Sequence, residues 1–255
     1  MTAAPDATPE ASPADPPAAP PARAPAAPPV GPEVDPTPRP LPARLPHRGG
    51  AVTLEPLGVR HAEELWEATR GAEESWAYMG YGPFPDFPGF RRFIAGFATT
   101  HDPMAWAVRP HVSGRASGWL TLMEIQPANA AIELGNIWFG PRLQRTRAAT
   151  EAMFLLMRHA MDDLGYRRLV WKCNALNAPS RRAAARLGFV PEGVHRAHLV
   201  VKGRRRDTAW FSILEDEWPA RRDAIAAWLA EGNFDHTGVA RRPLRAGEGA
   251  ERAAG

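Results

Sequence analysis

From residue 51 onward, the spacing of apolar residues changes repeatedly between a period of two and a period of three to four residues. Stretches with an apolar residue at every second position predict strands, and stretches with apolar residues three or four positions apart predict helices. We expect strands over 51–57, 104–110, 117–126, 130–140, 167–174, 198–203 and 207–214. We expect helices over 58–70, 90–100, 147–164, 180–187 and 219–231. This order of elements is typical of a layered α/β domain.

The first fifty residues lack this pattern. They hold sixteen of the 28 prolines and contain no Phe, Trp, Tyr or Ile. A segment of that composition cannot bury enough apolar surface to offset the entropy lost when it is ordered. We therefore expect a disordered arm over 1–48, an ordered domain over 49–218, a C-terminal helix over 219–235 and a flexible tail over 236–255.

Composition argues against several classes of protein. The chain has 255 residues and a net charge of +3, and its single cysteine, Cys173, can form neither an internal disulfide nor a cysteine-based zinc site. It begins without the apolar run of a secretory signal, and no later stretch is long and apolar enough to span a membrane. The arginines at 204–206 come without a nucleic-acid-binding motif. We expect a cytoplasmic protein without membrane, metal or direct nucleic-acid binding.

The segment over 140–152 joins a predicted strand to a predicted helix. The first turn of a helix exposes unpaired N–H groups and the positive end of the helix dipole, which suit a phosphate. Arg145 and Arg147 add positive charge beside that turn. Thr146 also suits an ordinary N-cap, so this spacing leaves anion binding and plain capping both open.

A second group of polar and glycine residues follows the strand over 167–174. In chain order it comprises Asn177, Ser180, Leu187, Gly188, Phe189, Glu192, Gly193, Arg196, Gly203, Asp207, Glu217 and Trp218. This order resembles the ribosomal-protein N-terminal acetyltransferase branch of the GNAT superfamily. The helix start resembles the acyl-CoA loop of that superfamily at Gln144, Ala149, Thr150, Glu151 and Ala152. The resemblance covers about 51–218.

The resemblance implies an α/β, GNAT-like fold with a mixed, mostly antiparallel sheet of about seven strands, splayed in the middle and flanked by about four helices. It implies an enzyme, a monomer or homodimer, that transfers an acetyl group directly from acetyl-CoA to a primary amine without a metal. The acceptor would be the N-terminus of a protein, such as a ribosomal protein. A small-molecule amine and a non-catalytic acyl-CoA-binding module are the alternatives.

The resemblance also assigns roles to residues. Acetyl-CoA would lie between the strand over 135–139 and the strand over 169–173. Its contacts would come from Ile137, Trp138, Phe139, Gln144, Arg145, Thr146, Arg147, Ala148, Ala149, Thr150, Asn177 and Ser180. Glu133 is the first candidate general base and His198 the second, although either could be structural. Ser180 is the candidate acid, or else a helix cap, because Ala184 stands where many relatives have a tyrosine.

Two departures from the family pattern affect the expected site. Arg147 stands where the family favours a glycine, which would adopt positive φ easily and let a phosphate approach the backbone. We expect the loop to shift so that the Arg147 side chain meets phosphate directly; the alternative is a loop that has lost its affinity. The aromatic segment over 75–90 would border the acceptor or pack as a surface loop. Cys173 is expected in the core.

Overall fold

The computed structural model describes residues 30–247, and all its strands lie in the compact unit that begins at Pro36. The described strands form one sheet in the order β1-β2-β3-β4-β5-β6-β8-β7. Every neighbouring pair is antiparallel except β5 and β6, which are parallel. The bounds are β1 His47–Arg48, β2 Val52–Pro56, β3 Met104–Pro110, β4 Gly118–Gln126, β5 Ala131–Phe139, β6 Arg168–Asn174, β7 Val190–Val201 and β8 Arg204–Leu214.

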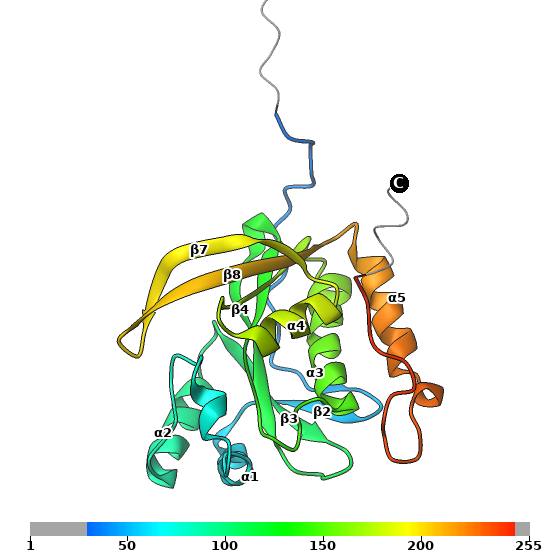
Figure 1. The fold of residues 1–255 in the computed structure, drawn as a ribbon. Helices are drawn as coiled ribbons and strands as arrows, with labels where there is room; N and C mark the ends of the chain where they lie inside the picture. Colours follow the sequence, from blue (N-terminus) through cyan, green and yellow to red (C-terminus); the bar gives the residue numbers. More distant parts are fainter. Residues whose placement is uncertain (1–29, 248–255) are drawn as a thin grey trace, which may run out of the picture. The chain divides into compact units, whose positions relative to one another are not determined.

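Five α-helices accompany the sheet in the described part of the chain (Figure 1). They are α1 Ala62–Ala68, α2 Phe87–Phe97, α3 Arg147–Arg158, α4 Ala178–Arg186 and α5 Trp218–Leu229. A π-helical turn over His159–Asp163 extends α3, and a 3₁₀ turn, η2, covers Glu73–Trp76. Helices α1 and α2 lie together below the β7–β8 hairpin in Figure 1, whereas α3, α4 and α5 lie to their right.

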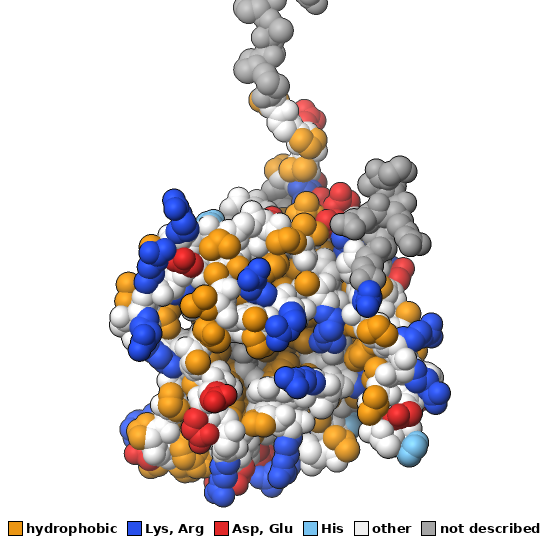
Figure 2. Space-filling view, in the orientation of Figure 1, with side chains coloured by type: hydrophobic (Ala, Val, Ile, Leu, Met, Phe, Trp, Pro, Cys, Tyr) orange, Lys and Arg blue, Asp and Glu red, His pale blue; other side chains and the backbone are white. Residues whose placement is uncertain are grey.

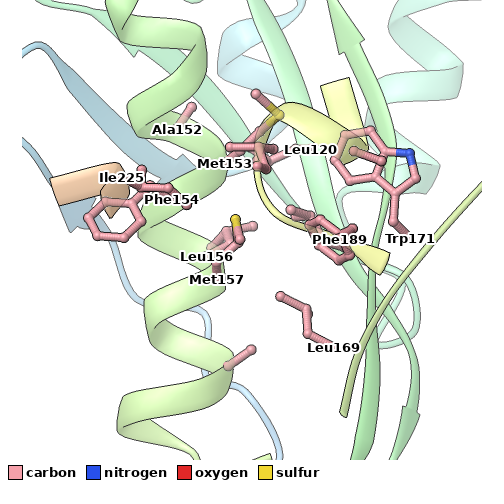
Figure 3. Close-up of a cluster of buried hydrophobic side chains, with 14 of the residues drawn as sticks. Leu120, Ala152, Met153, Phe154, Leu156, Met157, Leu169, Trp171, Phe189 and Ile225 are labelled. Carbon is pink, nitrogen blue, oxygen red and sulfur yellow. The ribbon is translucent and has the colours of Figure 1, made fainter. Parts of the chain in front are cut away.

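The larger core lies between the sheet and α3. Figure 3 shows Met153, Leu156 and Met157 of α3 near Leu169 of β6 and Phe189, all of them buried. Burying side chains of this size contributes roughly 1.5–3 kcal/mol each. The helical spacing of its apolar residues therefore fixes which face of α3 meets the sheet.

A second core, on the other face of the sheet, is mainly aromatic. Trp138 of β5 stacks on Trp119 of β4 with ring centroids 4.7 Å apart, and on Trp76 of η2 at 4.8 Å. Phe90 and Ile94 of α2 are fully buried in the same cluster. These contacts fix the segment between α1 and α2 against the centre of the sheet.

The fold class expected from the sequence is confirmed, and the differences have local causes. The eighth strand is the two-residue β1, which lies in the segment assigned to the arm. Helix α2 begins at Phe87 rather than 90 because the Asp86 carboxylate accepts the N–H of Gly89 at 2.7 Å and caps it. Within residues 30–247 no helix has the length and apolar character needed to cross a membrane.

Residues 36–48 correct the expected boundary of the disordered arm. The Trp106 Nε1–H donates to the Leu45 carbonyl at 2.8 Å, and the Tyr166 hydroxyl donates to the Pro40 carbonyl at 3.1 Å. Proline-rich chain loses little entropy on ordering, and these partners lie 61 and 126 residues away, where local composition cannot reveal them. Residues 1–29 of the predicted arm lie outside the described residues.

The tail expected to be flexible also contains packed residues. Leu244 and Ala246 are buried in the larger core, and the Ala246 N–H donates to the Arg186 carbonyl at 3.2 Å. Trp228 of α5 donates its indole N–H to the Arg242 carbonyl at 2.8 Å. The tail therefore packs as far as Ala246, and residues 248–255 of the prediction lie outside the described residues.

Candidate active site

The site begins where β5 and β6 separate. The two strands pair only at three positions, from Ala131 with Arg168 to Glu133 with Val170. The split therefore starts at Trp171, two positions later than the predicted start at Leu169. Beyond it, the backbone groups that face the split have no neighbouring strand to pair with, so they suit the amides of an extended ligand.

A β-bulge lies at the start of the split. Thr121 pairs with Gly135, but Trp119 pairs with Trp138, so Asn136 and Ile137 together oppose one residue of β4. Asn136 has a positive φ of 47°. A bulge of this kind bends the strand and redirects its N–H groups, which is common beside active sites.

Gly135 makes room for the Glu133 carboxylate. A Cβ at Gly135 would lie 2.8 Å from Glu133 Oε1 and 2.7 Å from the sulfur of Met123. Both contacts are closer than real Cβ contacts allow, so a side chain there would displace one of its neighbours. The Glu-x-Gly spacing in β5 therefore places a carboxylate immediately before the bulge.

Glu133 is paired with a lysine that the sequence analysis did not include in the site. Lys172 Nζ of β6 lies 2.8 Å from Glu133 Oε2, and both side chains are at most 7% exposed. Lys172 also contacts the Glu124 carboxylate and lies 4.3 Å from the ring centre of Trp210. The alternation of side chains along β6 does predict that Lys172 faces away from the core. It does not predict which carboxylates Lys172 contacts.

Burial and charge act in opposite directions on the pKa of Glu133. Burial is the larger effect and raises the pKa to about 7, although the hydrogen bond and charge of Lys172 lower it. The charge of Glu124 raises this pKa, and the charge of Arg206 lowers it. A carboxylate with a pKa near neutrality exchanges protons readily at pH 7, as a general base requires. Glu133 is therefore not an exposed strand carboxylate, but it does form a salt bridge, with Lys172.

Ser180 lies on the other face of the sheet, at the start of α4. Its Oγ accepts the indole N–H of Trp171 at 3.1 Å, and its own N–H donates to Asn177 Oδ1 at 3.1 Å. Asn177 therefore caps α4. The Ser180 hydroxyl interacts with the buried Cys173 thiol, whose pKa is raised by its burial. A raised pKa keeps this thiol protonated, which argues against an acetyl-cysteine route.

No hydrogen bond among the described residues connects His198 to Glu133. It lies on β7, is exposed, and places Nδ1 3.1 Å from the Thr208 hydroxyl oxygen. Its ring centre is 6.1 Å from that of Trp210, whose ring in turn covers Lys172. As a candidate base it is therefore less favourably placed than Glu133.

The loop before α3 has the geometry of an anion site. Thr146 caps α3 by accepting the Ala149 N–H at 3.1 Å, and Gln144 donates its amide to the Phe139 carbonyl at 2.8 Å. The N–H groups of Arg147 and Ala148, in the first helical turn, have no helix carbonyl to bind. Capping and anion binding are therefore compatible here, because the cap uses only one of the exposed N–H groups.

Arg147 does not meet the expectation of a phosphate ligand. Its guanidinium donates to the Leu229 carbonyl at the end of α5 at 2.7 Å and lies 4.7 Å from the ring centre of Phe234. The positive φ of the loop occurs at Arg145, at 64°, whereas Arg147 is the first residue of α3. The position therefore does not need the conformational freedom of glycine, and the side chain points to α5.

Another arginine stands beside the same helix turn. Both terminal nitrogens of Arg186, at the end of α4, lie 3.2 Å from the Thr150 hydroxyl oxygen. Figure 2 shows basic side chains over α4 and beneath it, and α4 carries Arg181, Arg182 and Arg186. The sequence analysis treated this helix only as a structural element, because nothing local indicates that its last turn meets α3.

The aromatic segment over 75–90 packs inward rather than lining an open acceptor cleft. Trp76 and Phe90 belong to the aromatic core, and Tyr81 accepts the Trp119 indole N–H at 3.1 Å. Tyr78 is the exception, because its exposed hydroxyl donates to the Leu176 carbonyl at 3.2 Å. Lys202, at the tip of the β7–β8 hairpin, donates to the Trp76 carbonyl at 2.7 Å.

One large cavity among the described residues does not coincide with the split. Its volume is about 1220 Å³, and its walls come from α1, the turn between β3 and β4, and the loop before α3. Three carboxylates line it, from Glu63, Glu64 and Glu67. Arg70, Arg115 and Arg142 line it as well, so the charges of its lining balance.

Comparison with known proteins agrees with this geometry. The Acetyltransferase (GNAT) domain family matches residues 51–190. YdaF of Bacillus subtilis, whose name provisionally describes a ribosomal N-acetyltransferase, is 29% identical over 105 residues, which are 41% of this chain and 57% of YdaF. The chain thus spans little more than half the length of this curated relative.

Two solved structures are similar over most of their length. A GCN5-related N-acetyltransferase from Brucella melitensis is 46% identical, with a TM-score of 0.80 over 82% of this chain and 96% of that one. A GNAT-family protein from Chromobacterium violaceum is 39% identical, with a TM-score of 0.70 over 76% of this chain and all of that one. The likeness therefore holds for sequence and fold together.

Proposed function

The chain belongs to the GNAT acetyltransferase family, and from this premise we propose that it transfers an acetyl group from acetyl-CoA to the N-terminal amine of a protein. The observation that carries the proposal is the buried Glu133 carboxylate, with a pKa of about 7, directly before the bulge in β5. Acetyl-CoA supplies the activated acetyl group. The chain supplies the groups that bind the donor and handle protons.

The residues present fit acetyl-CoA. The unpaired edges of Ile137 to Phe139 and of Trp171 to Cys173 would hold the amide-bearing arm of the donor in the split. The free N–H groups of Arg147 and Ala148 would bind its pyrophosphate, with Arg145 adding positive charge. Trp138 would contribute only its backbone, because its side chain stacks between Trp76 and Trp119.

Glu133 would take a proton from the incoming ammonium, directly or through a water. Lys172 keeps this carboxylate in place and favours its ionised form. N–H groups redirected by the bulge would stabilise negative charge on the acetyl oxygen. His198 is the second candidate base.

Ser180 would protonate the departing thiolate. It lies on the α4 side of the sheet, opposite Glu133, so the base and the acid would act from the two sides of the split. Its hydroxyl oxygen already accepts a hydrogen bond from Trp171, which leaves its own proton for donation. The alternative role of Ser180 is to bind the donor, and Asn177 would then act only as the cap.

The acceptor side favours an amine at the end of a chain. The contacts of Lys202 with Trp76 and of Tyr78 with Leu176 join segments from both sides of the region in front of Glu133. A terminus can enter beneath such contacts, whereas a lysine within a folded surface cannot. The name of YdaF points in the same direction, and a ribosomal acceptor would require a cytoplasmic enzyme. A small-molecule amine is the second candidate, because the same contacts would admit it.

Thiol release in the presence of acetyl-CoA tests the proposal. The acceptors should be peptides with free Ser, Ala or Thr termini, the same peptides with blocked termini, and a panel of amino acids, polyamines and aminoglycosides. Turnover with free-terminus peptides alone is the expected result. If only small amines react, the acceptor is a small molecule; if no amine reacts while acetyl-CoA still raises the melting temperature, the chain is a binding module.

A further inference from the structure

The β7–β8 hairpin places two arginines on the same face of the sheet as the candidate base. Trp210 pairs with Lys172 across β8 and β6, and alternate residues of a strand share a face. Arg204 and Arg206 therefore share the face of Trp210, where Glu133 and Lys172 meet. Arg205 and Asp207 lie on the opposite face.

The arginines on the two faces differ in their partners. Arg205 pairs with Asp207 through Nε and Oδ1 at 2.9 Å. Within residues 30–247, neither Arg204 nor Arg206 has a carboxylate close enough for an ion pair, and the buried Nε of Arg206 has no hydrogen-bond partner. The charge of Arg206 reaches Glu133, since it lowers the pKa of that carboxyl. The face toward Glu133 thus presents guanidinium groups that no carboxylate among residues 30–247 neutralises.

The hairpin continues past the end of its neighbour. Strand β6 pairs with β8 only as far as Asn174 with Thr208, followed by one further bond from the Ala175 N–H to the Asp207 carbonyl. Residues 204–206 therefore project beyond β6, toward the open end of the split. In Figure 2, Lys and Arg side chains gather on the left, where Figure 1 draws the β7–β8 hairpin.

The spacing along β8 sets which part of an acceptor would meet these groups. Arg206 is four residues from Trp210 and Arg204 is six, which corresponds to about 13 and 20 Å along an extended strand. An extended peptide has nearly the same rise per residue. If its amine lies at Glu133 beside Trp210, the side chains of about its fifth and seventh residues lie near Arg206 and Arg204.

We propose that the inner face of the hairpin, Arg204 and Arg206, binds acidic side chains at about positions 5 to 7 of the acceptor. The acceptor class is therefore a protein with a free N-terminus followed by Asp or Glu residues. This inference rests on the proposed N-terminal acetyltransferase activity. Guanidinium–carboxylate pairs give both attraction and geometric selectivity, because the planar fork fits both carboxylate oxygens.

Two matched peptides test the inference. One has the sequence Ser-Ala-Ala-Ala-Asp-Glu-Asp-Ala, and the other carries Asn and Gln in place of Asp and Glu. For the wild-type chain we expect kcat/KM to be about tenfold higher for the acidic peptide, mainly through a lower KM. Raising the NaCl concentration should reduce the preference, because salt screens exposed charges.

Variants on the two faces of β8 supply the control. The double variant Arg204→Gln/Arg206→Gln should lose the preference. The two peptides are compared at pH 9, because Arg206 also lowers the pKa of Glu133 and its loss should reduce turnover of both peptides alike at pH 7. Arg205→Gln, on the opposite face, should keep the preference. Arg204→Lys/Arg206→Lys should retain a part of it, and an unchanged acetyl-CoA melting shift would show that each variant is folded.

Each other outcome overturns the inference in a distinguishable way. Equal kcat/KM for the two peptides with wild-type protein would remove the acidic preference while leaving N-terminal acetylation intact. Turnover of small amines alone would remove the proposed function itself. A third outcome is that poly(U) RNA binds the wild-type chain but not the Arg204→Gln/Arg206→Gln variant, while the two peptides react equally. That result would show that the surface binds nucleic acid instead of an acidic acceptor.

Discussion

The donor side and the acceptor side of the split are built in different ways. On the donor side, Gln144 bonds to Phe139 and Thr146 bonds to Ala149, so each contact closes within five residues. On the acceptor side, Lys172 meets Glu124 from 48 residues away and Lys202 meets Trp76 from 126 residues away. Donor binding would depend on backbone N–H groups, whereas acceptor chemistry would depend on particular side chains. Substitutions should therefore be tolerated on the first side and costly on the second.

The largest expected effect is that of Glu133→Gln. Removing the proton acceptor should lower kcat by roughly 10²- to 10³-fold, the usual range for a general base. Acetyl-CoA affinity should stay within about twofold, because the donor is held by backbone groups elsewhere. Thiol release gives the rate and calorimetric titration gives the affinity. An unchanged kcat would remove Glu133 as the base and leave His198, which His198→Gln would then test.

Lys172→Met should shift the pH dependence of the same reaction. The ionised carboxylate is the active form, so wild-type kcat/KM should rise with pH through about 7. Lys172 lowers the pKa of Glu133, so its removal should move this rise to higher pH by about 1 unit. Activity at pH 7 should fall about fivefold and recover toward pH 9.

Lys172→Arg supplies the control for this pH shift. It keeps a positive charge beside Glu133 and should restore most of the wild-type profile. The other charged groups that act on Glu133, Glu124 and Arg206, are unchanged in both variants. A loss of rate that is equal at every pH would show that Lys172 matters only for folding or packing, and that it does not adjust the base.

The contrast between local and distant contacts also explains what the sequence could predict. The order of strands and helices, the cap at Thr146 and the cap at Asn177 follow from residues within a few positions of each other. The spacing of Glu133 and Gly135 was visible too. The pairing of Glu133 with Lys172 was not, because it depends on the register of two strands whose paired residues are 37 positions apart in the chain.

Arg147 illustrates a distant contact that local reasoning missed in the same way. Its position in the motif suggested contact with phosphate, because local reasoning sees only the helix start. The structure brings the end of α5 to the same place, and the Leu229 carbonyl there is a strong acceptor for a guanidinium. The boundary of the arm failed similarly, since Trp106 and Tyr166 hold it from far along the chain.

Arg147→Ala should therefore affect stability rather than donor binding. It removes a charge-assisted hydrogen bond and a cation–π contact at a partly buried site, which should lower the free energy of unfolding by about 1–2 kcal/mol. Affinity for acetyl-CoA should change less than about twofold. Arg145→Ala, in the exposed part of the loop, is the matched variant and should show the reverse, a salt-dependent loss of affinity with little change in stability. If Arg147→Ala weakens acetyl-CoA binding more than Arg145→Ala, the side chain reaches phosphate after all.

Tyr78→Phe should have the smallest effect and is the most selective probe of the acceptor side. It deletes one exposed hydrogen bond, to the Leu176 carbonyl, and leaves the aromatic ring in place. Such a bond contributes about 0.5–1 kcal/mol, so KM for a peptide acceptor should rise about two- to fivefold. The KM for acetyl-CoA should not change, because the donor would lie on the other side of the split. Equal changes in both KM values would show that this contact orders the whole split, and the separation between a donor side and an acceptor side would then fail.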